Sequence, residues 1–148
     1  MKTLLVLLTL SQLFNHQEAH KTLWPRRGAT QKCLTWHMIG KTKTNKHIWA
    51  VRVQGQRPGT VLITSGVHGD EKMSVAASLS VAKSLCAQKT KPKQTVLIVP
   101  ILNPDGYSGK YKCKRGNRTC ADINRDAFKW KTPEGRAFRA LFKRHKVV

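Results

Sequence analysis

The order of apolar and polar positions predicts a β-α-β unit in the middle of the chain. Apolar residues alternate with polar ones over 47–53, which is typical of a half-buried strand, and the β-branched run 61–64 predicts a second, buried strand. Residues 71–87 repeat apolar side chains at spacings of three and four, as an amphipathic helix does. The continuous apolar run 96–99 predicts a third strand, buried on both faces. Strand, helix and strand in this order favour a right-handed crossover between two parallel strands.

The last third of the chain begins with a loop and ends with a helix. Residues 103–126 show little apolar periodicity and are rich in Gly, Asn, Lys and Arg. A loop of this length in a compact domain is often functional. Thr132 and Pro133 predict the start of a helix, with the threonine as its cap and the proline in its first turn. Residues 147–148 resemble the beginning of a further strand.

Two segments precede the predicted domain. Residues 1–19 hold one positive charge and a short apolar run, the pattern of a secretory signal peptide. The run is too short to span a bilayer, which takes about 20 apolar residues. The alternative is an ordinary N-terminal helix or strand over residues 4–14. Residues 20–46 are polar and basic, and we expect an exposed lead-in to a domain over 47–148. Export predicts a periplasmic or secreted protein.

The charge of the chain is strongly unbalanced. It has 28 lysines and arginines against 7 acidic residues, a net charge of +21. Such a field attracts anionic partners, including nucleic acid, acidic lipids and cell-wall polymers. No nucleic-acid-binding motif is present and aromatic residues make up 7% of the chain. A basic protein that binds nucleic acid or another anionic polymer is therefore one hypothesis, and a solvated basic surface is its alternative.

The four cysteines allow three pairings, and the sequence does not choose among them. They are Cys33, Cys86, Cys113 and Cys120. No C-x-x-C pair occurs, so a structural zinc knuckle is not indicated. Cys113 and Cys120 share one loop and could close it in an exported protein. Buried or free thiols are the alternative.

The candidate chemistry lies where a predicted strand gives way to the helix. His68 and Glu71 follow the strand 61–64, and open parallel sheets bind ligands beyond the carboxyl ends of their strands. An H-x-x-E spacing can aim an imidazole and a carboxylate at one point, and both groups suit Zn²⁺. The alternative is a solvated histidine beside a glutamate that the helix dipole favours.

Four motifs in order make the pattern more specific. G-x-H-G-D-E at 66–71 is followed by N-P-D-G at 103–106, R-G-N at 115–117 and D-I-N-R at 122–125. This order resembles the zinc carboxypeptidase family of the carboxypeptidase A type, and its small bacterial murein peptide amidases are the nearest match. The aspartoacylase and desuccinylase branch shares the His/Glu motif but does not usually show N-P-D-G. The resemblance implies an α/β fold with a mixed, mostly parallel sheet and flanking helices.

The resemblance also implies a zinc site. His68 and Glu71 would be two of three protein ligands of one zinc ion. Asp122 would accept a hydrogen bond from the other ring nitrogen of His68, which fixes the tautomer and raises the basicity of the ligand.

The same resemblance implies a substrate site beside the zinc. Arg115 would act in catalysis by polarising the scissile carbonyl and stabilising the oxyanion that develops on it. Asn124 and Arg125 would bind a terminal carboxylate, which a guanidinium meets through two parallel hydrogen bonds. Asp126 stands where the family usually has Asn, which brings the fine positioning of the substrate into question.

The family needs two further groups, a third zinc-binding histidine and a late general-base glutamate, and neither is present in this sequence. His145 is the only histidine after His68, and it precedes the apparent start of a strand whose far end should carry the ligand. At about 3.3 Å per residue, His145 would lie far from the metal. We therefore expect the N-terminal part of a zinc carboxypeptidase-like hydrolase, truncated and inactive as residues 1–148. Its expected substrate is a peptide or peptidoglycan peptide with a free carboxylate. The alternative is a non-catalytic remnant that binds carboxylates or metal.

Overall fold

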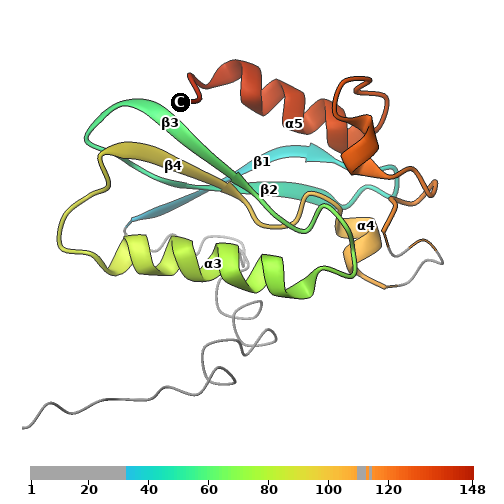
Figure 1. Ribbon diagram of the computed structural model, residues 1–148, viewed down its shortest axis with the longest axis horizontal. Helices are drawn as coiled ribbons and strands as arrows, with labels where there is room; N and C mark the ends of the chain where they lie inside the picture. Colours follow the sequence, from blue (N-terminus) through green and yellow to red (C-terminus); the bar gives the residue numbers. More distant parts are fainter. Residues whose placement is uncertain (1–32, 110–112, 114) are drawn as a thin grey trace, which may run out of the picture.

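The computed structural model describes residues 33–109, 113 and 115–148, so the predicted signal peptide (1–19) lies outside the described residues. The described chain forms a sheet with a helix on each face (Figure 1). The elements in chain order are β1 (Leu34–Lys41), β2 (His47–Val53), β3 (Arg57–Thr64), α3 (Lys72–Ala87), β4 (Gln94–Val99), α4 (Pro104–Tyr107), η1 (Ile123–Asp126) and α5 (Pro133–Arg144). No helix in these residues is long and apolar enough to cross a membrane.

The four strands lie in the order β1-β2-β4-β3. Strands β3 and β4 are parallel and joined through α3, as the β-α-β pattern predicts. The mixed α/β sheet is confirmed, but the described strands are not mostly parallel, because the β1–β2 and β2–β4 pairs are antiparallel. A tight turn at 42–46 joins β1 to β2, with Thr42 N–H donating to the Lys46 carbonyl at 2.9 Å. So short a connection admits only an antiparallel pair.

Strand β1 corrects the expectation of an exposed lead-in for residues 33–46, and residues 20–32 of that lead-in lie outside the described residues. It pairs with β2 along its whole length, from Leu34 opposite Val53 to Lys41 opposite His47. Leu34 is 2% exposed and belongs to the hydrophobic core. The polar and basic residues around this segment obscured a strand-like alternation, in which Leu34, Trp36 and Met38 share one face.

Each face of the sheet buries its own apolar cluster. Helix α3 covers one face, and Val75, Leu79 and Ala82, each 1% exposed, pack there against β2 and β4. This is the helix face that the sequence predicts. Helix α5 covers the opposite face, where Leu141 packs with Ile48 of β2 (Figure 1). Burial on both faces explains why β4 reads as an unbroken apolar run.

The start of α5 follows the predicted capping pattern. Thr132 accepts a hydrogen bond from the backbone N–H of Gly135 at 2.9 Å, and Pro133 occupies the first helical turn. After the helix the chain returns to the sheet, and Val147 bridges Thr60 of β3 in a parallel sense. The strand-like character of residues 147–148 is therefore confirmed as a bridge to β3.

Both pairs of cysteines form disulfides, which fit a secreted or periplasmic protein. Cys33 and Cys86 tie the start of β1 to the end of α3, across 53 residues of sequence. Cys113 and Cys120 close a loop of sequence separation 7, the pairing that their shared loop suggested. Of the three possible pairings, the structure therefore has Cys33–Cys86 with Cys113–Cys120.

The two disulfides should differ in their contribution to stability. A cross-link removes more chain entropy from the unfolded state when it closes a longer loop. We expect the Cys33→Ser/Cys86→Ser variant to lose about 4 kcal/mol of unfolding free energy, and the Cys113→Ser/Cys120→Ser variant about 2 kcal/mol. Urea unfolding of the two variants beside the parent chain measures both losses. Equal losses of unfolding free energy in the two variants would contradict the expected dependence on loop length.

Candidate metal centre

The candidate site begins where β3 and β4 end. The two strands remain paired beyond their last residues, because Ser65 N–H donates to the Val99 carbonyl at 2.9 Å and Leu102 N–H donates to the Ser65 carbonyl at 3.1 Å. The Ser65 hydroxyl also donates to the Pro100 carbonyl at 2.8 Å and lies 2.7 Å from the hydroxyl of Ser78 in α3. The chain that leads to His68 is thus held by both the next strand and the helix.

A glycine is required in this turn. Gly66 has a φ of +56°, a left-handed conformation that costs other residues energy. A β-carbon here would lie 3.0 Å from Ile101 Cα, the Pro100 carbonyl and Val75 Cγ2. The first glycine of the G-x-H-G-D-E motif therefore serves the close approach of the two strand ends.

His68 lies between two carboxylates. Its Nδ1 is 2.7 Å from Glu71 Oε1, and its Nε2 is 3.2 Å from Asp122 Oδ1. The His68 side chain is 7% exposed, whereas those of Glu71 and Asp122 are 47% and 37% exposed. The imidazole is buried, and the carboxylate on its Nδ1 side is open to solvent. The structure thus brings together three of the residues that the sequence singles out.

The two carboxylates stabilise the charged imidazole. The hydrogen bond with Glu71 raises the pKa of His68 most strongly, burial opposes it, and the bond with Asp122 raises it further, so the net pKa is above its ordinary value. Burial would raise the pKa of Asp122, but hydrogen bonds from His68 and from the Asn124 N–H outweigh it and lower that pKa. Without a metal, the two carboxylates therefore favour the protonated imidazole, which can donate to both of them.

Glu71 is turned away from its own helix. It occupies the N-cap position of α3, yet its side chain makes no capping hydrogen bond. N-cap side chains commonly accept from the first backbone N–H groups of the helix. Here the carboxylate meets His68 Nδ1 instead. Ser74, in the first turn of α3, donates its hydroxyl to the Glu71 carbonyl at 2.7 Å and accepts from the Gly66 N–H at 3.2 Å, which ties the helix start to the turn before His68.

The donor chemistry fits two ligands of a zinc site. An imidazole nitrogen and a carboxylate oxygen, both common zinc donors, converge within 2.7 Å. Asp122 on Nε2 favours the tautomer that leaves the Nδ1 lone pair for a metal. Among the described residues, no group of three or more His, Cys, Asp or Glu side chains is placed to hold a metal ion. Two donors are therefore what this part of the chain supplies.

Asn103 connects the loop that carries Arg115 to the loop that carries His68. Its side-chain amide donates to the Gly116 carbonyl at 2.9 Å and to the Val67 carbonyl at 3.3 Å. Each of these carbonyls belongs to a neighbour of a predicted site residue. Arg115 is exposed at this point of the chain. The fully buried Asn103 was recognised only as part of a motif, and its structural role was missed.

Two more buried polar residues organise the same region. Asn117 accepts from the N–H groups of Thr119 and Ala121 through its side-chain oxygen, and its amide donates to Glu134 Oε2 at 3.0 Å. Burial raises the pKa of Glu134, which is fully enclosed at the start of α5. Asp105, also fully enclosed, lies 3.3 Å from Lys46 Nζ and so holds the β1–β2 turn. Asn117 and Asp105, both part of the sequence motifs, therefore stabilise the loop region through buried contacts.

Asp122 connects the segment that carries Asn124 and Arg125 to His68. Both are exposed on the short helix η1. Asp122 Oδ1 accepts from the Asn124 N–H at 2.9 Å while also contacting His68 Nε2. One carboxylate oxygen therefore links the start of η1 to the imidazole, which fixes where the predicted carboxylate-binding residues emerge.

Asp126 has a structural role at the start of α5. It is 6% exposed, and its carboxylate accepts from the N–H groups of Lys131 and Thr132 at 2.8 and 2.9 Å and from the Thr132 hydroxyl at 2.7 Å. A β-carbon on Gly135 would lie 2.2 Å from Asp126 Oδ2, so the glycine makes room for the carboxylate. The departure at Asp126 is therefore matched by an inward contact to α5.

His145 follows α5 as its C-cap residue. It lines a cavity with residues of β1, β2 and β4, and none of the predicted site residues lines that cavity. No contact joins it to His68 among the interactions of the described residues, in keeping with the expected separation.

The Asp126 contacts predict an acid-dependent contribution to stability. Burial alone would raise the pKa of Asp126, but its hydrogen bonds with Thr132 and Lys131 lower it below the ordinary 3.8. A carboxyl with a lowered folded-state pKa stabilises the fold above its unfolded pKa, and this stability is lost as the pH falls through the folded pKa. We expect Asp126→Asn to cost about 2 kcal/mol of unfolding free energy near neutral pH. The side-chain NH₂ of asparagine would replace one carboxylate oxygen and would face an N–H donor of Lys131 or Thr132.

The test is the difference in unfolding free energy between the parent chain and Asp126→Asn, followed from pH 6 downward. The difference should shrink once the pH falls below about 4. Asp70→Asn is a suitable control, because Asp70 is exposed. A difference that does not change with pH would contradict the role given to the charged carboxylate.

Comparison with known proteins agrees with the motifs. A sequence model described as zinc carboxypeptidase matches residues 27–144. No curated protein is similar enough in sequence to count as a match.

Solved structures share the fold at low sequence identity. A metallo-carboxypeptidase from Pseudomonas aeruginosa, in complex with (2-guanidinoethylmercapto)succinic acid, has a TM-score of 0.61 at 20% identity over 78% of this chain and 33% of its own. Carboxypeptidase A from Helicoverpa armigera has a TM-score of 0.65 at 19% identity over 93% of this chain and 42% of its own. An aspartoacylase family protein from Mesorhizobium loti has a TM-score of 0.59 at 19% identity, covering 77% and 38%. The chain thus spans less than half the length of each of these three structures.

Proposed function

Because the chain belongs to the zinc carboxypeptidase family, we propose that it carries the first half of a metallocarboxypeptidase-like hydrolase site. The observation that carries the proposal is the convergence of His68 Nδ1 and Glu71 Oε1 within 2.7 Å, with Asp122 on the opposite ring nitrogen. Zinc, when bound, supplies Lewis-acid chemistry that polarises a carbonyl and activates water. The substrate would be a peptide, or a cell-wall peptide, with a free carboxylate near the bond that is cleaved.

The chain's own residues would divide the work as follows. His68 and Glu71 hold the metal, and Asp122 keeps the His68 proton on Nε2. Arg115 donates hydrogen bonds to the carbonyl oxygen as charge develops on it, a form of electrostatic stabilisation that usually contributes strongly to catalysis. Support for this role comes from the Asn103 bridge, which ties the Gly116 backbone to the backbone beside His68.

Asn124 and Arg125 would position the substrate. Both are exposed on η1, and the backbone N–H of Asn124 donates to the same Asp122 oxygen that contacts His68. A substrate carboxylate on Arg125 would therefore be held at a fixed offset from the metal ligands. Holding a reactant in the correct geometry is itself a large part of catalysis.

Two protein donors do not make a catalytic zinc site, which normally has three plus an open position. Residues 1–148 alone should therefore bind zinc weakly and release no C-terminal residue from a peptide. Turnover by this chain at a rate proportional to its concentration would contradict that expectation. Export through residues 1–19 is part of the proposal, and the two disulfides support an oxidising compartment.

Zinc binding should depend on the three residues in different ways. We expect His68→Ala and Glu71→Ala each to abolish measurable site binding, because each removes one of two donors. Asp122→Asn should weaken binding about 10–100-fold, since it removes the partner that orients the ligand. Titration against a coloured zinc chelator measures all three.

The matched control for this series is Asp70→Asn, which removes an exposed carboxylate next to Glu71. It should bind zinc like the parent chain, within about twofold. Equal weakening by Asp70→Asn and Asp122→Asn would mean that general charge, rather than the His68 contact, controls the affinity.

Recognition of a free carboxylate tests the substrate class separately. A short peptide with a free C-terminus should bind more tightly than the same peptide amidated. Arg125→Gln should remove about tenfold of that preference, because it removes a charge-assisted hydrogen bond. Lys129→Gln, which removes a nearby exposed charge, should keep the preference. Loss of the preference in both variants would assign it to the basic surface as a whole.

A further inference from the structure

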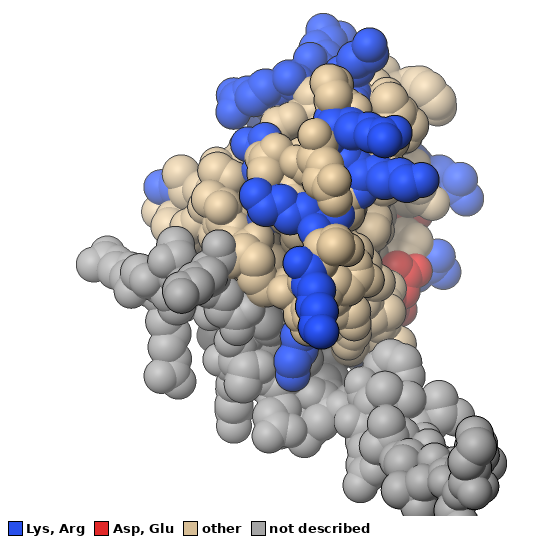
Figure 2. Space-filling view, turned by 90° about the vertical axis from the view of Figure 1, so that its left-hand side faces the viewer, with Lys and Arg blue, Asp and Glu red and all other residues tan. Residues whose placement is uncertain are grey.

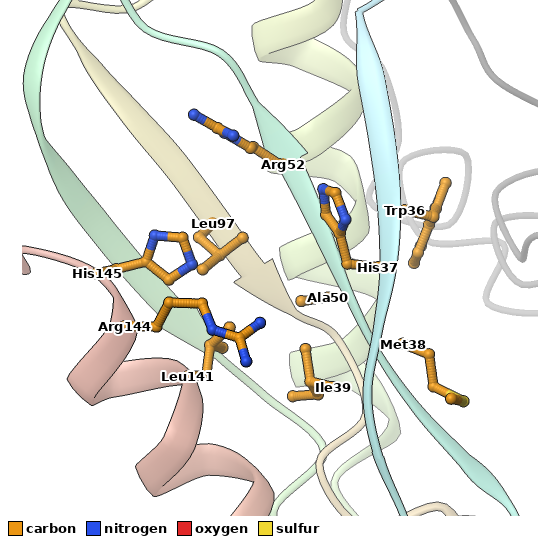
Figure 3. Close-up of a pocket in the computed structure, with 10 residues that line it drawn as sticks. All are labelled: Trp36, His37, Met38, Ile39, Ala50, Arg52, Leu97, Leu141, Arg144 and His145. Atoms are coloured by element: carbon orange, nitrogen blue, oxygen red, sulfur yellow. The ribbon is translucent and has the colours of Figure 1, made fainter.

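The sheet face beneath α5 is only partly covered. Ile48 and Ala50 of β2 lie on this face and are fully buried. Arg52, the next β2 residue on the same face, lies near the end of α5 at Arg144. A cavity of about 430 Å³ opens there between β1, β2, β4 and the C-terminal end of the helix (Figure 3).

Basic side chains reach this cavity from three elements. They are Arg52 from β2, His37 from β1, and Arg144 and His145 from the end of α5. His37 and Ile39 point toward the helix, whereas Trp36 and Met38 point to the other side of β1 (Figure 3). None of the residues that line the cavity is acidic. Burial lowers the pKa of His145, and the nearby charges of Arg52, Arg144 and His37 lower it further.

The arginines are not balanced by protein acceptors. Arg52 Nε is buried without a hydrogen-bond partner. Within the described part of the chain, the ion pairs are those of Lys46 and His68, and neither arginine takes part in one. A buried donor without an acceptor is costly. The negative end of the helix dipole favours Arg144, but it does not explain Arg52 and His37 on the strands.

A second cavity, of about 440 Å³, adjoins the first and shares Arg52, Arg144 and His145 with it. It adds Arg57 and Lys146, and again no acidic residue lines it. Figure 2 shows the corresponding end of the molecule, where lysine and arginine side chains are spread over the surface and acidic ones are few. The cavities therefore lie in a strongly positive field, which concentrates anions.

We propose that the cavity between Arg52 and Arg144 binds a tetrahedral oxyanion, a phosphate or sulfate group. Guanidinium groups meet such oxyanions through paired, charge-assisted hydrogen bonds. The guanidinium groups of Arg52 and Arg144 do not face each other in Figure 3, so an anion bound by both would require the Arg52 side chain to turn toward the helix end. A tetrahedral anion has oxygen atoms for donors on both sides of the cavity, whereas one arginine can satisfy both oxygens of a carboxylate. The site shares no residue with the candidate metal centre, so either proposal can fail alone.

The test is calorimetric titration of the full chain with inorganic sulfate and inorganic phosphate. The parent chain should bind with saturation. Arg52→Gln and Arg144→Gln should each weaken binding about tenfold. Arg144 is exposed at a helix end, so Arg144→Gln keeps the test valid even where Arg52→Gln disturbs the sheet.

Lys83→Gln is the matched control, because it removes one positive charge from the exposed surface of α3. It should change the affinity less than about twofold, as a screened distant charge does. Equal weakening by all three substitutions, or no saturable binding to the parent chain, would overturn the proposal.

Dextran sulfate, with uncharged dextran beside it, distinguishes a free anion from an ester group on a polymer. If the group is free, dextran sulfate should bind no more tightly per sulfate than inorganic sulfate. If it is carried on a polymer, dextran sulfate should bind at least about tenfold more tightly and compete with inorganic sulfate. In both cases Arg144→Gln should weaken binding, and insensitivity to that substitution would refute the site.

Discussion

The hydrogen-bonded series Asp122–His68–Glu71 is the interaction on which the site depends. It joins three separate pieces of the fold: the loop after β3, the first residue before α3, and the start of η1. The imidazole is buried, and each of its nitrogens meets a carboxylate, so its orientation is fixed from both sides. This arrangement leaves the Nδ1 side, together with Glu71, as the exposed edge at which the proposed metal would be held. The backbone hydrogen bonds that keep the ends of β3 and β4 together make this orientation possible.

Buried polar side chains perform the same task for the rest of the loop region. Asn103 ties the backbone beside Arg115 to the backbone beside His68, and Asn117 ties that loop to Glu134 at the start of α5. Asp126 then fixes η1 against the same helix. Long loops have little apolar surface to bury, so side-chain hydrogen bonds to the backbone replace a core here. The loop that presents Arg115, Asn124 and Arg125 is thus positioned by residues that take no direct part in the proposed chemistry.

Sequence reasoning recovered the elements whose pattern is local. The β-α-β unit, the α3 face and the α5 cap follow from apolar spacing and capping residues, and the structure confirms them. Strand β1 was missed because its alternation lies among polar and basic residues. The expectation of a mostly parallel sheet was wrong for the described strands, because the tight turn at 42–46 makes β1 and β2 antiparallel and the apolar pattern does not carry that information. The motif placed His68, Glu71 and Asp122 together. The inward contacts of Asn103, Asn117 and Asp126, and the arginines beneath α5, depend on long-range packing that a linear pattern does not carry.

The most direct test of the account is nitrogen-15 NMR of His68 with and without zinc, using long-range couplings that report each ring nitrogen. The account predicts that zinc shifts Nδ1 to the range of a metal-bound nitrogen, while Nε2 keeps its proton toward Asp122. Binding through Nε2, or a His68 ring that does not respond to zinc, would contradict it.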